Sequence, residues 1–244
     1  MTDALANKTA LVTGASRGIG KAIAIALAEA GANVAVNYRE KKKEAEETVA
    51  AVKALGKKSA AFQADVSQSN QVAALITAVE KQLGPIDILV NNAGHALTRS
   101  IDELTEEDFD RTIATNLKSA FLCTNAVFKA MRTRGWGRII NISSGAARGA
   151  GVVGAHYNAS KAGMEGLTRG YASRLAKDNV LVNAVAPSLI ATEMIAPHRS
   201  ANVGKIPVGR LGTSEEIAQV VVMVATNAYM TGQTVAVNGG MHFN

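Results

Sequence analysis

The sequence contains little cysteine and few aromatic side chains. Of its 244 residues, one is a cysteine, Cys123, and phenylalanine, tryptophan and tyrosine together make up 4%. A lone cysteine cannot form an intrachain disulfide, so we expect a reducing compartment and a buried Cys123. With so few aromatic residues, the core must be built from Ala, Val, Ile and Leu, which suits parallel strands covered by helices.

Long apolar runs and concentrated charge are also lacking. No run approaches the ~18 apolar residues of a membrane-spanning helix, and residues 1–8 have no leader-like pattern. The net charge of +6 is dispersed, and acidic residues follow the one basic run, residues 41–43, as is typical of a solvated helix face. The four histidines have no ligand spacing. We therefore expect a cytoplasmic protein that binds no nucleic acid, membrane or metal.

Apolar segments alternate with segments of helical composition along the whole chain. Parallel strands need long crossover connections, so this alternation predicts βαβ units. We expect an α/β fold, a single-domain doubly wound (Rossmann-type) three-layer sandwich with a seven-stranded parallel sheet, over residues 1–244. The expected strands are 9–13, 33–38, 59–64, 86–90, 139–143, 180–186 and 234–237, and the expected helices are 18–30, 43–55, 69–83, 106–132, 156–177 and 214–226.

Tyr157 and Lys161 are four residues apart, so in a helix they lie one turn apart on the same face. A neighbouring ammonium would lower the pKa of the phenol from its ordinary value of ~10, which makes Tyr157 a candidate general acid. The spacing alone also fits a solvated pair on a helix surface. Ser144 ends an expected strand 13 residues before Tyr157, so the two hydroxyls could converge on one substrate oxygen.

Three glycines lie between the first expected strand and the first expected helix, at Gly14, Gly18 and Gly20. Backbone amides at a helix N-terminus can receive a pyrophosphate, and glycine lets the phosphates approach the backbone closely. The same glycines would also serve a tight turn with no ligand.

The end of the second expected strand bears on the choice of cofactor. Enzymes that use NAD generally place a carboxylate there, to accept a hydrogen bond from the ribose. This chain has no acid before Glu40, whereas Arg39, together with Arg17, could pair with a 2′-phosphate. We therefore predict NADP(H) over NAD(H).

Together, Ser144, Tyr157-x-x-x-Lys161, the glycine segment 13–20 and the segment 91–94 (Asn-Asn-Ala-Gly) resemble the short-chain dehydrogenase/reductase family, over about residues 8–240. The resemblance implies that Asn116 joins Ser144, Tyr157 and Lys161 as a catalytic residue and holds a water behind the lysine. It also implies cofactor contacts from Gly14, Ser16, Arg17, Gly18, Ile19, Gly20, Arg39, Asp65, Val66, Asn92, Ala93, Gly94, Tyr157, Lys161, Pro187, Ile190 and Thr192.

Some of these residues also have structural interpretations. Asn116 could be a buried structural amide, Asp65 could form a turn before a helix, and residues 92–94 could form a simple turn. Ser188 stands where the family usually has glycine, which leaves the local backbone path open.

The resemblance also implies a reaction, in which hydride passes from a nicotinamide to a ketone. Ser144 would hold the carbonyl oxygen, Tyr157 would protonate it, and Lys161 would lower the tyrosine pKa and bind the nicotinamide ribose.

Within the family, the glycine loop and residues 91–94, 209–212 and 231–241 are most similar to the 3-oxoacyl-[acyl-carrier-protein] reductases of fatty acid biosynthesis. That similarity implies a thioester substrate, docking of acyl carrier protein and a homotetramer. Arg132, Arg134 and Arg138 could form part of the docking patch, or could simply be solvated. Because the lid region 194–207 is short, a broad-specificity NADPH carbonyl reductase is the alternative, and a non-catalytic NADP-binding scaffold is a third possibility.

Overall fold

The computed structural model describes residues 3–193 and 203–242, and in them the expected strands form one sheet. All seven strands are parallel, in the order β3-β2-β1-β4-β5-β6-β7, which confirms the predicted Rossmann-type architecture. The strands are β1 (Thr9–Val12), β2 (Asn33–Tyr38), β3 (Ser59–Gln63), β4 (Ile88–Asn91), β5 (Gly137–Ile142), β6 (Val180–Pro187) and β7 (Thr234–Val237).

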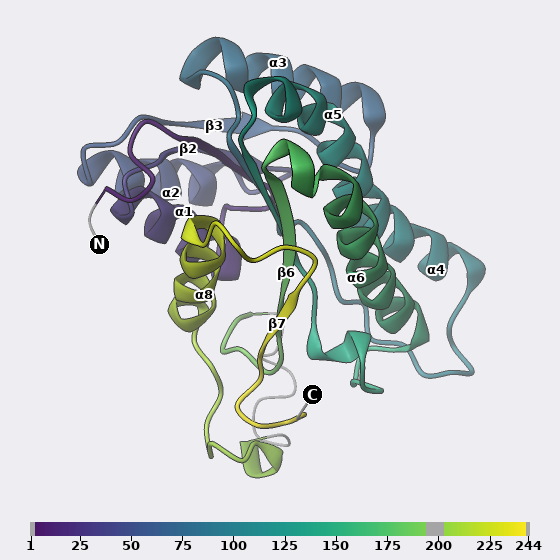
Figure 1. The fold of residues 1–244 in the computed structure, drawn as a ribbon. Helices are drawn as coiled ribbons and strands as arrows, with labels where there is room; N and C mark the ends of the chain where they lie inside the picture. Colours follow the sequence, from purple (N-terminus) through teal and green to yellow (C-terminus); the bar gives the residue numbers. More distant parts are fainter. Residues whose placement is uncertain (1–2, 194–202, 243–244) are drawn as a thin grey trace.

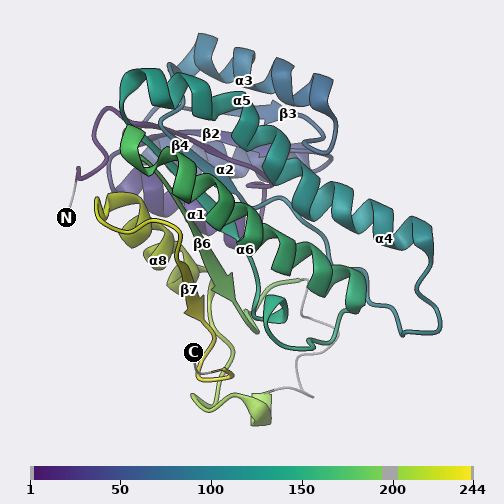
Figure 2. The same cartoon turned by 45° about the vertical axis from the view of Figure 1, so that its right-hand side comes forward.

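Helices cover both faces of this sheet (Figure 1). Helices α1, α2 and α8 lie on one face, and α3, α5 and α6 lie on the other (Figures 1 and 2). The α-helices are α1 (Gly18–Glu29), α2 (Lys42–Ala54), α3 (Ser69–Leu83), α4 (Glu106–Ile113), α5 (Ser119–Arg134), α6 (Ala155–Leu175) and α8 (Ser214–Thr226).

The strand side chains supply both cores because successive residues of a strand point to opposite faces. In β1, Val12 packs with α1 and α8, whereas its neighbour Leu11 packs with α3 and α5. Both side chains are fully buried. The sheet is therefore covered on each face, as a parallel sheet requires.

Strand order reverses between β1 and β4, at the centre of the sheet. From β1 the chain proceeds outwards to β2 and β3, then returns to β4 on the other side of β1. Ligands of doubly wound sheets bind in the crevice that this reversal leaves beyond the carboxyl ends of the strands. The glycine segment follows β1 and residues 92–94 follow β4, so both flank this crevice.

The structure corrects several element boundaries, and β5 begins at Gly137, two residues earlier than expected. β4 begins at Ile88, two residues later than expected, and helix α6 ends at Leu175, where a 3₁₀ turn follows. The expected helix 106–132 is continuous but not uniform, since Ala114–Lys118 forms a π-helical segment between α4 and α5. It ends at Arg134, before the left-handed Gly135.

Three further expectations concern Cys123, the lid region and membrane-spanning helices. Cys123 is fully buried, as predicted, and desolvation raises the pKa of its thiol to about 12. Of the lid region 194–207, residues 194–202 lie outside the described residues. Within residues 3–193 and 203–242, the structure contains no helix with both the length and the apolar character needed to cross a membrane.

Candidate active site

Ser144, Tyr157 and Lys161 come together beyond the carboxyl end of β5. Ser144 follows this strand, while Tyr157 and Lys161 lie on the first two turns of α6. The Ser144 side chain lies close enough to the Tyr157 phenol to contribute to lowering its pKa. The Lys161 Nζ lies 5.8 Å from the centroid of the Tyr157 ring and donates to the Ile142 carbonyl at 2.8 Å. One strand end and one helix thus present two hydroxyls and an amine at the same place.

The pKa values of this group differ from the sequence expectation. Desolvation raises the pKa of Tyr157 above its ordinary value of 10, and the Ser144 side chain offsets this only in part. Lys161 is almost completely buried, and desolvation lowers its pKa to about 8. Lys161 is not among the causes of the Tyr157 shift, so the lowering of the tyrosine pKa by Lys161 stays a prediction. At neutral pH the phenol carries the proton that a general acid must donate.

Asn116 lies in the π-helical segment and is fully buried. Its Nδ2 donates to the His95 carbonyl at 3.0 Å and to Ser160 Oγ at 3.2 Å, and its Oδ1 accepts from the His95 amide at 2.9 Å. A Cβ on Gly94 would lie 3.2 Å from Asn116 Oδ1 and 3.7 Å from Lys161 Nζ. Asn116 therefore lies near Lys161 and also fixes the loop after β4. Its interpretation as a buried structural amide thus holds together with its place at the site.

The glycine segment has the shape of a phosphate cradle. Gly14 and Gly18 have positive φ values of 62° and 54°, which L side chains rarely adopt. A Cβ on Gly20 would lie only 2.4 Å from the Gly14 carbonyl oxygen. Arg17 is the residue before α1, and its side chain makes no capping hydrogen bond with the described residues. The first amides of α1 thus receive no side-chain acceptor from Arg17, which leaves them available to the pyrophosphate of a dinucleotide.

The loop after β4 closes on the glycine segment. Asn92 Nδ2 donates to the carbonyls of Thr13 and Gly14 at 2.9 and 3.0 Å. A Cβ on Gly14 would lie 3.0 Å from the Cα of Ala93. The side chain of Asn92 thus holds the cradle in shape, which was one of the two interpretations left open for this loop.

Other predicted contact residues also lie at the carboxyl edge of the sheet, and some of them make structural contacts within the chain. Asp65 Oδ1 accepts from the amide and hydroxyl of Ser67 at 2.9 and 2.7 Å, so it forms the expected turn before α3. The next residue, Val66, is buried in the core. Thr192 packs near the cradle, since its methyl lies 3.7 Å from a Cβ placed on Gly18.

The two arginines assigned to a 2′-phosphate are paired with carboxylates. Arg39 follows β2, and its Nε donates to Glu40 at 2.9 Å. Arg17 pairs with Glu193, which follows the β6 loop. All four side chains are exposed. Desolvation, followed by the positive charges of Arg111 and Arg39, lowers the pKa of His95 in the loop after β4.

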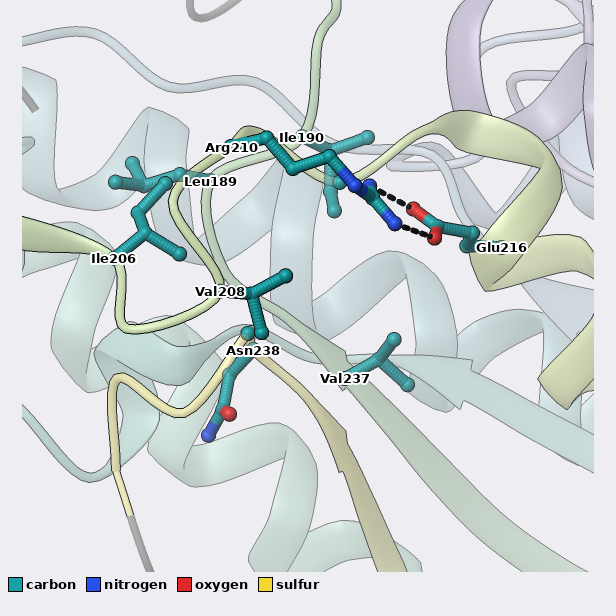
Figure 3. Close-up of a pocket in the computed structure, with 10 residues that line it drawn as sticks. Leu189, Ile190, Ile206, Val208, Arg210, Glu216, Val237 and Asn238 are labelled. Atoms are coloured by element: carbon teal, nitrogen blue, oxygen red, sulfur yellow. Dashed lines mark hydrogen bonds and ion pairs between the residues drawn. The ribbon is translucent and has the colours of Figure 1, made fainter. Parts of the chain in front are cut away.

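A pocket of about 190 Å³ lies behind the segment that follows β6 (Figure 3). Ile190 forms one wall and bridges to Gly212, and a two-contact ion pair between Arg210 and Glu216 lies at the side (Figure 3). The hydrogen bonds from Arg210 lower the pKa of Glu216 to about 2. The pocket is lined by Leu189, Ile190, Ile206, Val208, Arg210, Gly212, Glu216, Val237, Asn238 and Gly239.

Ser188 precedes this pocket wall and settles the backbone question raised by the sequence. It is not among the described residues with positive φ, so serine fits here without strain. Its amide donates to the Val237 carbonyl at 3.2 Å, and its side chain lies against Gly145, the residue after Ser144.

The three arginines assigned to a docking patch are engaged within the chain. Arg138 is 4% exposed and stacks on Trp136 at 4.5 Å, so its assignment to an exposed patch is wrong. Arg132 pairs with Asp178 at 2.9 Å, and Arg134 donates to the Ile86 carbonyl. This group lies where α5 ends and β5 begins, at the amino edge of the sheet, opposite the crevice.

Two polar residues of the site were missed in the sequence. Asn37, inside β2, accepts from the Gly14 amide at 3.2 Å and donates to carbonyls of β3 and its loop, so it braces the cradle. Glu165 lies on α6, one turn after Lys161, and is 5% exposed. An asparagine in an otherwise apolar strand and an acid four residues after Lys161 were the available signals.

Comparison with known proteins leads to one family. The family model described as short chain dehydrogenase matches residues 8–203. The 3-oxoacyl-[acyl-carrier-protein] reductase FabG of Staphylococcus aureus is 44% identical over 243 residues, covering 96% of this chain and 98% of the relative. The 3-oxoacyl-[acyl-carrier-protein] reductase of Synechocystis sp. is 44% identical over 242 residues, covering 98% of each chain. The crystal structure of a short-chain type dehydrogenase/reductase from Mycobacterium marinum aligns with a TM-score of 0.93 at 35% identity, over 98% of this chain and 97% of that chain.

Proposed function

The chain belongs to the short-chain dehydrogenase family, and from this premise we propose that it reduces the keto group of a 3-oxoacyl thioester with NADPH. The convergence of Ser144, Tyr157 and Lys161 beyond the carboxyl end of β5 carries the proposal. Relatives covering nearly the whole chain are named 3-oxoacyl-[acyl-carrier-protein] reductases, which supports the substrate class.

Each residue of the site has a separate role in this reaction. A reduced nicotinamide supplies the hydride when it is bound. Ser144 donates a hydrogen bond to the keto oxygen and stabilises the charge that develops there. Tyr157, protonated at neutral pH, gives its proton to that oxygen. Lys161 lies within reach of both the phenol and the loop after β4, where its amine can hold the ribose.

The cofactor would lie in the crevice between the loops after β1 and β4. The cradle at Gly14, Gly18 and Gly20 and the uncapped start of α1 fit a pyrophosphate. For the 2′-phosphate we propose Arg39 and Arg17. Their guanidinium groups are exposed and, among the residues that the structure describes, pair with exposed carboxylates, contacts that a phosphate dianion can displace at little cost.

An assay of NADPH oxidation tests the proposal. Acetoacetyl thioesters of acyl carrier protein and of coenzyme A are compared with simple ketones. Preference for the thioesters supports the 3-oxoacyl reductase, and preference for simple ketones supports a broad carbonyl reductase. No ketone reduction by the wild-type chain would leave an NADP-binding scaffold.

Replacing Tyr157 with Phe tests the assigned proton donor. The ring keeps its packing but loses the transferable proton, so we expect kcat to fall by at least ~10²-fold. Binding of NADPH, followed by fluorescence titration, serves as the control for an intact cofactor site. Turnover near that of the wild type would remove Tyr157 from the mechanism.

Acyl carrier protein and a homotetramer remain part of the proposal. Docking of the carrier would need a surface other than the Arg138 region, because that arginine is buried at the opposite edge of the sheet. Large apolar side chains are exposed on helices α4 and α5, at Phe109 and Phe121, and could be covered by a second copy.

A further inference from the structure

A buried carboxylate lies against the segment that carries the catalytic serine. Glu165 is on α6, one turn after Lys161, and only 6% of its side chain is exposed. Its Oε1 accepts a hydrogen bond from Ser143 Oγ at 3.4 Å. Its Oε2 accepts from Arg148 Nε at 3.2 Å. The reaction described above uses neither Glu165 nor these two partners.

The two partners flank Ser144 along the chain. Ser143 directly precedes it, and its hydroxyl also lies 3.3 Å from the Lys161 carbonyl. Arg148 follows four residues later, after the short 3₁₀ turn Gly145–Ala147, and its amide donates to the Gly145 carbonyl at 3.2 Å. A single carboxylate thus ties both ends of the Ser144 turn to the helix that carries Tyr157 and Lys161.

A charged group at this position calls for a reason beyond stability. A buried carboxylate must be paired and hydrogen-bonded, and an apolar residue of similar volume is often no less stabilising. The contacts of Glu165 are directed at the serine segment and not at the cradle. We propose that Glu165 is a positioning residue, whose carboxylate fixes the Ser144 hydroxyl relative to Tyr157 through Ser143 and Arg148. This inference rests on the proposed function.

The expected effect is on turnover. Ser144 must face the Tyr157 hydroxyl and the keto oxygen at once, and a small misplacement of a catalytic group can lower a rate by up to ~10²-fold. Replacing Glu165 with Gln keeps the shape and removes the charge that holds Arg148. We expect kcat to fall about 10- to 100-fold, with the KM for NADPH within about twofold of the wild type, because the cradle is untouched.

Substitutions of Arg148 give a second route to the same result, and they serve if Glu165→Gln does not fold. Arg148 is 41% exposed and can be replaced without leaving a hole in the core. Arg148→Met should reproduce the loss of kcat, and Arg148→Lys, which keeps a charge for the carboxylate, should restore part of it. Lys57→Met removes an ion pair with Asp3 away from the site and should leave kcat unchanged.

A Ser144→Ala background separates positioning from general loss of structure. If Glu165 acts through Ser144, adding Glu165→Gln to Ser144→Ala should change kcat by less than about twofold, since the two effects are not additive. The same fold loss in both backgrounds would overturn the inference.

A measurement that needs no turnover completes the test. The Ser144 side chain contributes to lowering the pKa of Tyr157, so a displaced serine should move the Tyr157 titration upwards. Carbon NMR of ring-labelled tyrosine, assigned with Tyr157→Phe, should show this shift for Glu165→Gln but not in the Ser144→Ala background. An unchanged Tyr157 titration in Glu165→Gln would overturn the inference. Absence of ketone reduction by the wild type would instead contradict the proposed function alone.

Discussion

At the scale of single residues, burial has the largest effect on the chemistry of the site. The charge of Lys161 was expected to lower the pKa of Tyr157, yet desolvation is the first cause of the pKa shifts of both residues. The two shifts have opposite signs because a buried acid and a buried base both favour their neutral forms. The sequence spacing predicted the proximity of the two side chains, but it could not predict how much water reaches them.

Lys161 should make the stability of the protein depend on alkaline pH. Its pKa falls from 10.5 to about 8 on folding, so between these values the unfolded chain binds more protons than the folded one. Its contribution to stability is therefore fully present above pH 10.5 and is lost as the pH falls through 8. Relative to Lys161→Met, the unfolding free energy should rise from pH 8 to 10 by up to about 1.4 kcal/mol per unit. Denaturant titrations of both proteins measure this difference, and parallel curves would contradict it.

Arg39 tests the preference for the phosphorylated cofactor. Its guanidinium is exposed and has an exposed carboxylate as its partner, so Arg39→Ala should leave stability nearly unchanged. Loss of a charge-assisted contact to phosphate, at about 1.5–3 kcal/mol, should raise the KM for NADPH by ten- to a hundredfold. The KM for NADH is the internal control and should change little. An unchanged KM for NADPH would refute the assignment.

At the scale of elements, the alternation of strands and helices gave the architecture correctly, and the details it missed are tertiary in origin. Hydrophobic periodicity located all seven strands, because the central strands are buried on both faces and the edge strands β3 and β7 are still partly buried. It could not show the π-helical segment, whose Asn116 bonds to a loop more than twenty residues away. Nor could it show that Arg138 is buried, since Trp136 and the start of β5 cover it only in the folded chain.

The turn between β1 and α1 should tolerate no added methyl group. Gly20→Ala would place a Cβ 2.4 Å from the Gly14 carbonyl and 2.5 Å from Asn92 Nδ2, so the cradle must open. We expect NADPH binding to weaken by at least tenfold, measured by fluorescence titration, together with a lower melting temperature. Gly166→Ala is the matched control, because this helical glycine has no atom within 4 Å of its added Cβ. There, alanine should stabilise α6 by about 0.4–1 kcal/mol.

At the scale of the whole molecule, the two edges of the sheet differ. The carboxyl edge gathers the loops after β1, β2, β3, β4, β5 and β6, which carry the proposed site. The amino edge is closed by Trp136, which lies between Lys8 and Arg138 at 3.9 and 4.5 Å. Residues far apart in sequence therefore meet at one edge, and only the completed sheet presents them together.

Exposed apolar groups predict assembly of the whole molecule. Phe109 and Phe121 are 41% and 43% exposed on α4 and α5, and covering side chains of this size with a second copy would remove apolar surface from water. We expect sedimentation velocity to give a species of four chains, and Phe121→Glu to give a smaller one. Leu55→Glu, at an equally exposed leucine after α2, should leave the size unchanged. A wild-type monomer would contradict the expectation.

The buried thiol on α5 can report how often the packing of this helix on the sheet opens. Cys123 is the chain's one sulfhydryl; in the packed state it is fully shielded and, with a pKa of about 12, almost entirely protonated at pH 8. An alkylating reagent can therefore reach it only when the packing of α5 on the sheet comes apart. The rate of Cys123 alkylation then measures how often this packing opens. A slower rate with added dinucleotide would measure how much the bound ligand stabilises the packing of α5 on the sheet.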